Sequence, residues 1–139
     1  SRSRAPELVT PDDFIEYDLD SQPTRDPGVG QYSERVIHGE IYKARPDVMA
    51  VVHCHCQEVI PFAAASVPLR PLYHMAYFVG EGVPVFEIRN AAGITDMLIS
   101  TPALGAALAG TLGGKSAALM RGHGAVVAAA SLRLVVAKA

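Results

Sequence analysis

An unbroken apolar run at residues 48–52 constrains the fold of this chain more than any other segment. It ends at His53-Cys54-His55, and turn-forming residues bound it. A short apolar run of this kind is typical of a β-strand covered on both faces. Because side chains alternate between the two faces of a strand, His53 and His55 point the same way and Cys54 points the other way. The run therefore predicts a covered sheet with two imidazoles side by side at a strand end.

A third imidazole follows a second apolar run. His123 comes after residues 117–120 and stands between Gly122 and Gly124. Flanking glycines let the backbone turn sharply and approach a ligand closely. Alone, this segment fits a tight hairpin with an exposed histidine equally well. Together with the first two imidazoles, His123 completes the open three-nitrogen platform that a catalytic divalent metal needs.

Glu34 and His38 form another candidate cluster. Their spacing of four residues places them on one face of a helix that we predict for residues 33–44, with Ser33 as its N-cap. Glu34 is a candidate acid/base near the metal, and His38 is a candidate helper. The alternative is an exposed pair that stabilises the helix by about 0.2–0.5 kcal/mol.

The rest of the chain alternates strand and helix patterns. We expect strands at residues 14–19, 48–53, 85–88, 117–121 and 125–129, and helices at 33–44, 58–65, 101–112 and after a capping Ser131. Alternating strands and helices predict an α/β fold with layers around one sheet.

Length, charge and cysteine content limit the number of domains, the partners and the location that we expect for this protein. The chain has 139 residues and a net charge of −2, which fits one domain and gives no electrostatic case for nucleic acid or a membrane surface. It begins without Met and stops inside a predicted helix, so we expect a single domain, 1–139, truncated at both ends. Cys54 and Cys56 are too close along one strand to pair, which favours reduced thiols and a cytoplasmic location.

Several of these residues together resemble the class II aldolase/adducin family. The matching residues are Ser33-Glu34, His38, Arg45-Pro46-Asp47, Val51-Val52-His53-Cys54-His55 and Gly122-His123-Gly124. The resemblance implies a three-layer α/β/α sandwich around a central, mostly antiparallel sheet. It also implies a homo-oligomer, usually a cyclic tetramer with active sites between subunits.

The resemblance also implies roles for single residues. His53, His55 and His123 are expected to bind a divalent metal ion, and Glu34 is expected to be the catalytic acid/base. Zinc is the first expectation, and three nitrogens also suit manganese, iron or cobalt.

Departures from the family pattern indicate the substrate. Sugar-phosphate aldolases of this family bind phosphate with a Ser/Thr-Gly pair and a Ser-Ser pair, which here read Ser3-Arg4 and Tyr32-Ser33. Arginine presents a planar fork that suits a carboxylate, and an aromatic ring lines a flat substrate. We therefore expect Arg4, Tyr32 and Ser33 to contact the substrate. For Arg4, binding to phosphate or to another subunit stays open.

These features favour a divalent-metal-dependent carbon–carbon lyase acting on a small molecule, foremost a decarboxylase of a hydroxy-aromatic carboxylate. Three alternatives stay open. They are a sugar-phosphate (fuculose-phosphate-like) aldolase, an iron-dependent oxygenase on the same fold, and a non-catalytic adducin-like interaction domain. A full set of three histidines and Glu34 argues against the last, because a scaffold has no use for an open metal site.

Overall fold

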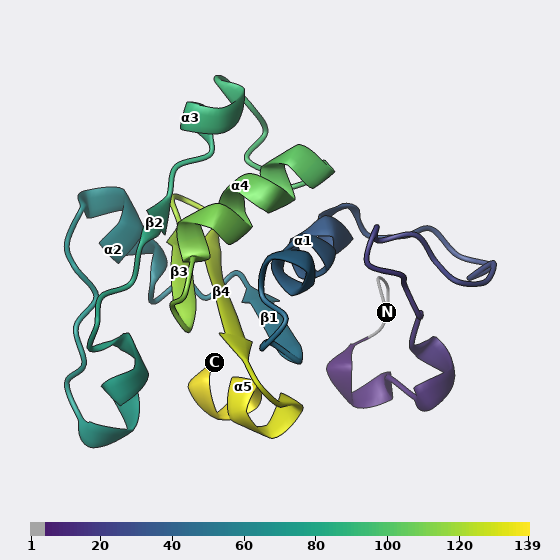
Figure 1. Cartoon of the computed structure of the whole chain (residues 1–139), viewed down its shortest axis with the longest axis horizontal. Helices are drawn as coiled ribbons and strands as arrows, with labels where there is room; N and C mark the ends of the chain where they lie inside the picture. Colours follow the sequence, from purple (N-terminus) through teal and green to yellow (C-terminus); the bar gives the residue numbers. More distant parts are fainter. Residues whose placement is uncertain (1–4) are drawn as a thin grey trace.

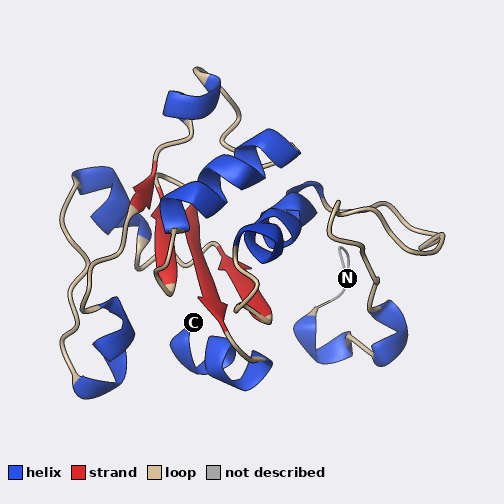
Figure 2. Cartoon of the chain, in the orientation of Figure 1, coloured by secondary structure: helices blue, strands red, loops and turns tan. Residues whose placement is uncertain are grey.

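The centre of the structure is a mixed four-stranded sheet with helices on both faces (Figures 1 and 2). The computed structural model describes residues 5–139. The strands are β1 (Ala50–Cys54), β2 (Val85–Phe86), β3 (Ala117–Met120) and β4 (Gly124–Ala129). Their order is β1-β4-β3-β2, in which β4 pairs antiparallel with β1 and β3, and β2 pairs parallel with β3. The predicted α/β fold with a mostly antiparallel sheet is confirmed.

Two layers of helices cover this sheet. The helices are α1 (Val36–Ala44), α2 (Ile60–Ala65), α3 (Arg89–Ala92), α4 (Pro102–Leu112) and α5 (Leu132–Lys138), with 3₁₀ turns η1 (Pro6–Leu8), η2 (Pro11–Asp13), η3 (Ser33–Arg35) and η4 (His74–Val79). Helices α1 and α4 pack on each other and on one face of the sheet. Helices α2 and α5 contribute to smaller clusters on the opposite face. This arrangement is the three-layer α/β/α sandwich that the family resemblance implies.

The larger core explains why these segments form helices and strands. Ile37 and Ile41 of α1 and Leu108 of α4 are fully buried, and they pack against Met120 and Val126 of the central strands. Apolar residues three or four apart line one face of a helix, whereas a strand between two helical layers needs apolar residues on both faces. Strands β3 and β4 are buried at every position, as such packing requires.

Two local expectations are wrong. Residues 14–19 form no extended strand, because only Tyr17 pairs, through an isolated bridge to Pro23, while Phe14 and Leu19 are exposed. Alternation alone cannot hold a strand that lacks a neighbour. Ser33 is not the N-cap either: Tyr32 holds that position, and a 3₁₀ turn starts the helix without a side-chain cap.

The other boundaries agree with the sequence to within a few residues. The Ser131 hydroxyl accepts a hydrogen bond from the Leu134 amide at 3.2 Å, as expected of the cap of the last helix. The sequence patterns do not predict the short helix α3 or the turn η4. Within residues 5–139, no helix combines the length and the apolar character needed to span a lipid bilayer.

Candidate metal centre

His53 lies near the end of β1 on the face that α1 covers. Its Nδ1 is 3.1 Å from the carbonyl oxygen of Ala125 in the neighbouring strand β4. A carbonyl can only accept, so Nδ1 carries the proton in this contact and Nε2 keeps a free lone pair. That Nε2 lies 3.1 Å from Nε2 of His55, which follows the strand directly. The predicted pair of imidazoles on one face is therefore formed.

His123 enters from the turn between β3 and β4. Its Nε2 lies 3.0 Å from Nε2 of His55, although the two residues are 68 positions apart in the sequence. Gly124 makes this approach possible, because a Cβ at that position would overlap the carbonyl oxygen of Cys54 and lie 3.0 Å from Cα of His55. Glycine thus lets the start of β4 lie directly against the end of β1.

Glu34 completes the cluster from the turn η3. Its side chain is buried, and Oε1 accepts a hydrogen bond from the Ile99 amide at 3.1 Å. Oε1 is also 3.3 Å from Nε2 of His123, while Oε2 is 3.4 Å from Nε2 of His53 and 3.7 Å from Nε2 of His55. The four potential ligand atoms lie within 4.8 Å of one another.

These residues fit a divalent metal ion. Tetrahedral coordination with metal–nitrogen bonds of about 2.0–2.1 Å places ligand atoms roughly 3.3 Å apart. The separations of 3.0 and 3.1 Å from Nε2 of His55 to the other two nitrogens, and of 3.3 to 3.7 Å to the carboxylate, are close to this value, and the whole set lies within 4.8 Å. A shared proton can satisfy only one contact of the His55 nitrogen, whereas one cation would satisfy all three rings at once.

Burial keeps nearby imidazoles neutral. It lowers the pKa of His123, although the carboxylate of Glu34 acts in the opposite direction. Burial, followed by the electrostatic interaction with the His53 ring, also lowers the pKa of His38 to about 4. Neutral imidazole is the form that binds a metal, so the surroundings of His123 favour a ligand.

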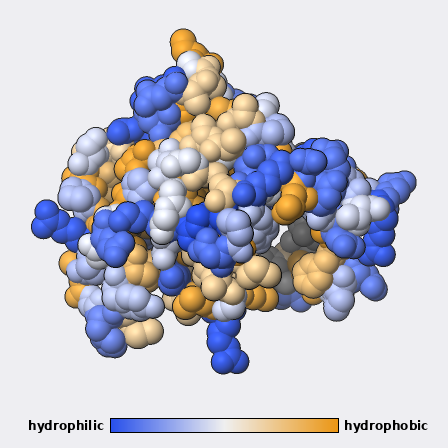
Figure 3. All heavy atoms as spheres, in the orientation of Figure 1, coloured by the Kyte–Doolittle hydropathy of each residue, from blue (hydrophilic) through white to orange (hydrophobic). Residues whose placement is uncertain are grey.

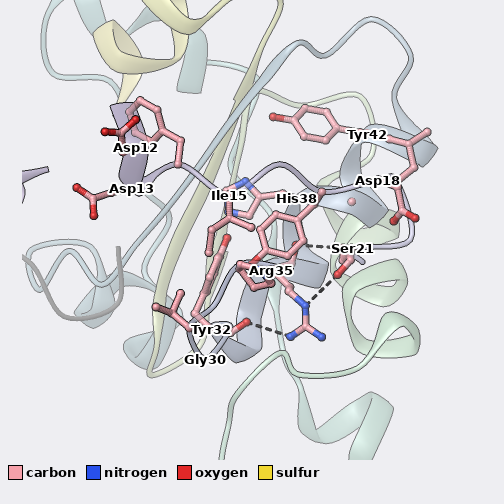
Figure 4. A pocket seen from close by; sticks show the side chains of 16 residues that line it. Asp12, Asp13, Ile15, Asp18, Ser21, Gly30, Tyr32, Arg35, His38 and Tyr42 are labelled. Atoms are coloured by element: carbon pink, nitrogen blue, oxygen red, sulfur yellow. Dashed lines mark hydrogen bonds between the residues drawn. The ribbon is translucent and has the colours of Figure 1, made fainter. Parts of the chain in front are cut away.

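His38 lies outside the four-residue cluster and lines a neighbouring cavity of about 860 Å³ together with Tyr17, Tyr32, Arg35 and Tyr42. Residues 12–30 and α1 both line the cavity (Figure 4), and Ser21 and Arg35 join the two segments through hydrogen bonds. Figure 3 shows a hollow on this side of the molecule. Burial raises the pKa of Tyr32 to about 12. The Tyr32 and His38 rings meet edge to face at 6.4 Å.

The structure also shows the surroundings of Ser33 and of the two cysteines. Ser33 is exposed and directly precedes Glu34. Arg4 lies outside the described residues. Cys54 is partly buried in the cluster on the opposite face of the sheet, as expected, and Sγ of Cys56 donates to Oε2 of Glu58 at 3.1 Å.

The sequence did not reveal three backbone groups that contact the centre: the Ala125 carbonyl, the Ile99 amide and the backbone of Met97, to which the His123 ring is hydrogen-bonded. Every residue type except proline has both backbone groups, so no pattern of residue types could indicate them. The one sequence signal is the pair Gly122 and Gly124, because glycine permits close approach of the backbone to a ligand side chain.

Fold and cluster together define the class: an α/β/α protein with a site that could hold one divalent metal ion at the edge of its sheet. The chain belongs to the class II aldolase and adducin N-terminal domain family, whose family model matches residues 3–139. The resemblance read from the sequence is thereby confirmed.

Three curated relatives show which activities occur among similar proteins. The chain is 38% identical to decarboxylase tropJ of Talaromyces stipitatus, over 89% of this chain and 52% of the relative. It is 34% identical to the 4-hydroxy-3-prenylphenylpyruvate oxygenase/4-hydroxy-3-prenylbenzoate synthase of Streptomyces roseochromogenus subsp. oscitans, over 89% and 43%. It is 31% identical to the 3,4-dihydroxyphthalate decarboxylase of Arthrobacter keyseri, over 88% and 50%. The chain thus spans about half the length of these relatives.

Among solved structures, l-fuculose-1-phosphate aldolase from Thermus thermophilus has a TM-score of 0.67 at 27% identity. The match covers 89% of this chain and 57% of the aldolase. Similar proteins therefore include decarboxylases, a protein named as an oxygenase and synthase, and an aldolase.

Proposed function

We propose that the protein is a divalent-metal-dependent carbon–carbon lyase that removes carbon dioxide from a hydroxy-aromatic carboxylate. The observation that supports this most strongly is the convergence of three imidazoles on one point with the buried Glu34 beside them. Three neutral nitrogens leave a cation its full charge and leave coordination positions open.

In this proposal His53, His55 and His123 hold the metal ion, with zinc as the first expectation. When bound, the ion stabilises negative charge that develops on a substrate oxygen beside the breaking bond. The carbonyl of Ala125 keeps the His53 ring in its orientation. A hydrogen bond from the ring nitrogen that does not face the metal commonly raises the basicity of the ligand and fixes its tautomer.

Glu34 carries the proton. The bond between the ring carbon and the carboxyl carbon breaks, carbon dioxide leaves, and the electron pair stays with the ring. Glu34 enters this step as the carboxylic acid: its proton takes the vacated position on carbon, and Glu34 is left as the carboxylate. The Ile99 amide holds Oε1, so Oε2 is the oxygen that we assign to proton transfer. His38, kept neutral by burial, is the second group to which we assign proton handling.

The substrate class is supported by the chemistry beside Glu34. Tyr32 is half exposed and stands two residues before Glu34, so its ring can lie along a flat substrate. Ser33 offers a hydroxyl at the same turn, and Arg4 is proposed to bind the carboxylate. A 3,4-dihydroxyphthalate decarboxylase among the relatives is consistent with such a substrate.

Two other activities each have one supporting observation. The likeness to l-fuculose-1-phosphate aldolase favours cleavage of a sugar phosphate. The relative named as an oxygenase favours oxygen chemistry with iron at the same ligands. Because the phosphate-binding pair reads Tyr32-Ser33 here, decarboxylation is the function that we favour.

A substrate panel on the purified protein tests this assignment. The metal content is measured first by elemental analysis, and the protein is then assayed with dihydroxyphthalates, hydroxybenzoates and ketose or aldose phosphates. We expect carbon dioxide from the aromatic acids, no cleavage of the sugar phosphates and no oxygen uptake. Sugar-phosphate cleavage without release of carbon dioxide would establish the aldolase, and oxygen consumption would establish the oxygenase.

The variant His55→Ala tests the metal site within the same assay. His55 provides the nitrogen that lies closest to both other rings, so we expect loss of bound metal and of turnover together. His74→Ala is the matched control, because it removes an exposed imidazole from η4. Full activity of a metal-free His55→Ala protein would contradict the proposal.

A further inference from the structure

The segment between α3 and α4 lies against the candidate metal centre and contacts it through its backbone. The Ile99 amide donates to Oε1 of Glu34 at 3.1 Å, and the side chain of Ile99 is fully buried. Two residues earlier, the backbone of Met97 accepts a hydrogen bond from the His123 ring. Because Nε2 of His123 faces His55, we assign this contact to Nδ1 of the ring.

Met97 adopts an unusual backbone conformation at this point. Its φ angle is +69°, in the left-handed region that costs a residue with a side chain about 1–3 kcal/mol. Two contacts hold the turn: the Met97 amide donates to Oγ1 of Thr95 at 3.2 Å, and the Leu98 amide donates to Oδ1 of Asp96 at 3.0 Å. The chain therefore holds Met97 in an unfavourable backbone conformation where its backbone contacts the candidate ligand His123.

The Met97 side chain fits a space that a glycine leaves open. Gly122 precedes His123, and a Cβ at Gly122 would come within 2.8 Å of Cε of Met97. Met97 also packs against the main hydrophobic core. Its side chain thus packs between the core and the residue next to His123, while the hydrogen bonds of Thr95 and Asp96 hold the turn.

We propose that Met97 is a positioning residue of the metal centre: its left-handed backbone orients the His123 ring, and the same segment holds Glu34 through Ile99. One short segment thereby sets the relative placement of two groups that come from η3 and from the turn between β3 and β4. This inference rests on the proposed function, because it assumes that His123 and Glu34 serve a metal centre.

Two substitutions separate the backbone of Met97 from its side chain. Glycine adopts positive φ without steric cost, whereas a β-branched residue strongly disfavours it. Met97→Gly therefore keeps the turn and removes the side chain, while Met97→Val removes most of the side chain and opposes the turn. Cobalt(II) is the probe, with affinity measured by calorimetry and coordination geometry read from its visible absorption.

Met97→Gly is expected to bind cobalt with nearly native affinity and spectrum, although it loses stability from the missing contacts. Met97→Val is expected to bind about 10- to 100-fold more weakly, the usual effect of removing a group that orients a ligand. Equal cobalt affinity and equal spectra for both variants would overturn the inference. If the native protein bound no cobalt, the metal centre itself, and with it the proposed function, would fail instead.

A second pair keeps the test decisive if Met97→Val does not fold. Thr95→Ala removes the hydroxyl that holds the Met97 amide, and Thr95→Ser retains it. We expect weaker cobalt binding and an altered spectrum for Thr95→Ala and native behaviour for Thr95→Ser. Native behaviour of both would show that the turn does not orient His123.

Discussion

At the scale of single residues, the two oxygens of Glu34 have different surroundings. Oε1 is fixed by the Ile99 amide, whereas Oε2 faces the rings of His53 and His55. A carboxylate held in this way keeps its position while one oxygen gains or loses a proton. This difference between the two oxygens predicts that charge at Glu34 matters more for turnover than for folding.

Glu34→Gln should keep the fold and lose turnover. The amide of glutamine can still accept a hydrogen bond from Ile99, but it cannot transfer a proton. We expect the decarboxylation rate to fall by about 10²- to 10⁴-fold, the usual contribution of an acid/base group. Rates and bound metal are measured together, with Glu81→Gln at an exposed ion pair as the control. A rate close to native would remove Glu34 from the chemistry.

His38 should make the stability of the metal-free protein depend on pH. Burial lowers its pKa from 6.5 to about 4, so the unfolded chain binds a proton at a pH where the folded protein does not. Stability from this group is complete above pH 6.5 and falls as the pH is lowered towards 4. The shift corresponds to a loss on the order of 3 kcal/mol.

Denaturant unfolding at several pH values measures this effect. In His38→Gln the unfolding free energy should decline less between pH 6.5 and 4 than in the native protein. His74→Gln, at an exposed position, should retain the native decline. An unchanged slope in His38→Gln would show that His38 is not the group responsible.

At the scale of elements, sequence patterns predicted the parts of the fold that depend on local chemistry. Residues 101–112 read as a helix because proline suits its first turn, and the Thr101 hydroxyl indeed caps it at 3.3 Å from the Leu104 amide. The alternation at residues 14–19 failed as a signal because pairing depends on neighbours that are distant in the sequence. Arg45 matches a family motif, but the sequence alone assigns it no role. In the structure it donates to the carbonyl of Gly113, which joins the C-terminal ends of α1 and α4.

Gly124→Ala should separate the two strands that carry the cluster. The added Cβ would overlap the Cys54 carbonyl, so β1 and β4 must move apart where His53 and His55 meet His123. We expect a loss of about 1–3 kcal/mol in stability, typical of overpacking, together with weaker metal binding. Calorimetry with cobalt and denaturant unfolding measure the two effects.

Gly110→Ala is the matched control for this variant. A Cβ at Gly110 in α4 meets nothing within 4 Å. Alanine in a helix interior is favoured over glycine by about 0.5–1 kcal/mol, so this variant should be slightly more stable and bind metal normally. Equal behaviour of the two alanine variants would contradict a role for close strand approach.

At the scale of the whole molecule, the site joins residues from η3, β1 and the turn after β3. Metal binding therefore requires that all of these segments are folded together. The sequence predicted the residue types of this site but not the backbone groups that hold them. The homo-oligomer and the cytoplasmic location stay predictions.

Metal binding should raise the thermal stability of the protein. A ligand that binds only the folded state stabilises it by about 2.7 kcal/mol at 100 times its dissociation constant. The melting temperature should therefore rise by several degrees when zinc or cobalt is added to the metal-free protein. Differential scanning calorimetry measures the shift, and His55→Ala should show none. An equal shift in that variant would place the metal elsewhere.

The separation of His55 and His123 by 68 residues has a consequence for biosynthesis. At about 5–20 residues per second, a ribosome adds the last imidazole roughly 3 to 14 s after the first two. During that interval the strand with His53 and His55 lacks its neighbour β4, and the incomplete chain has only part of the cluster. We expect the new polypeptide to bind the ion only after β4 has paired with β1 and His123 has joined the other two imidazoles.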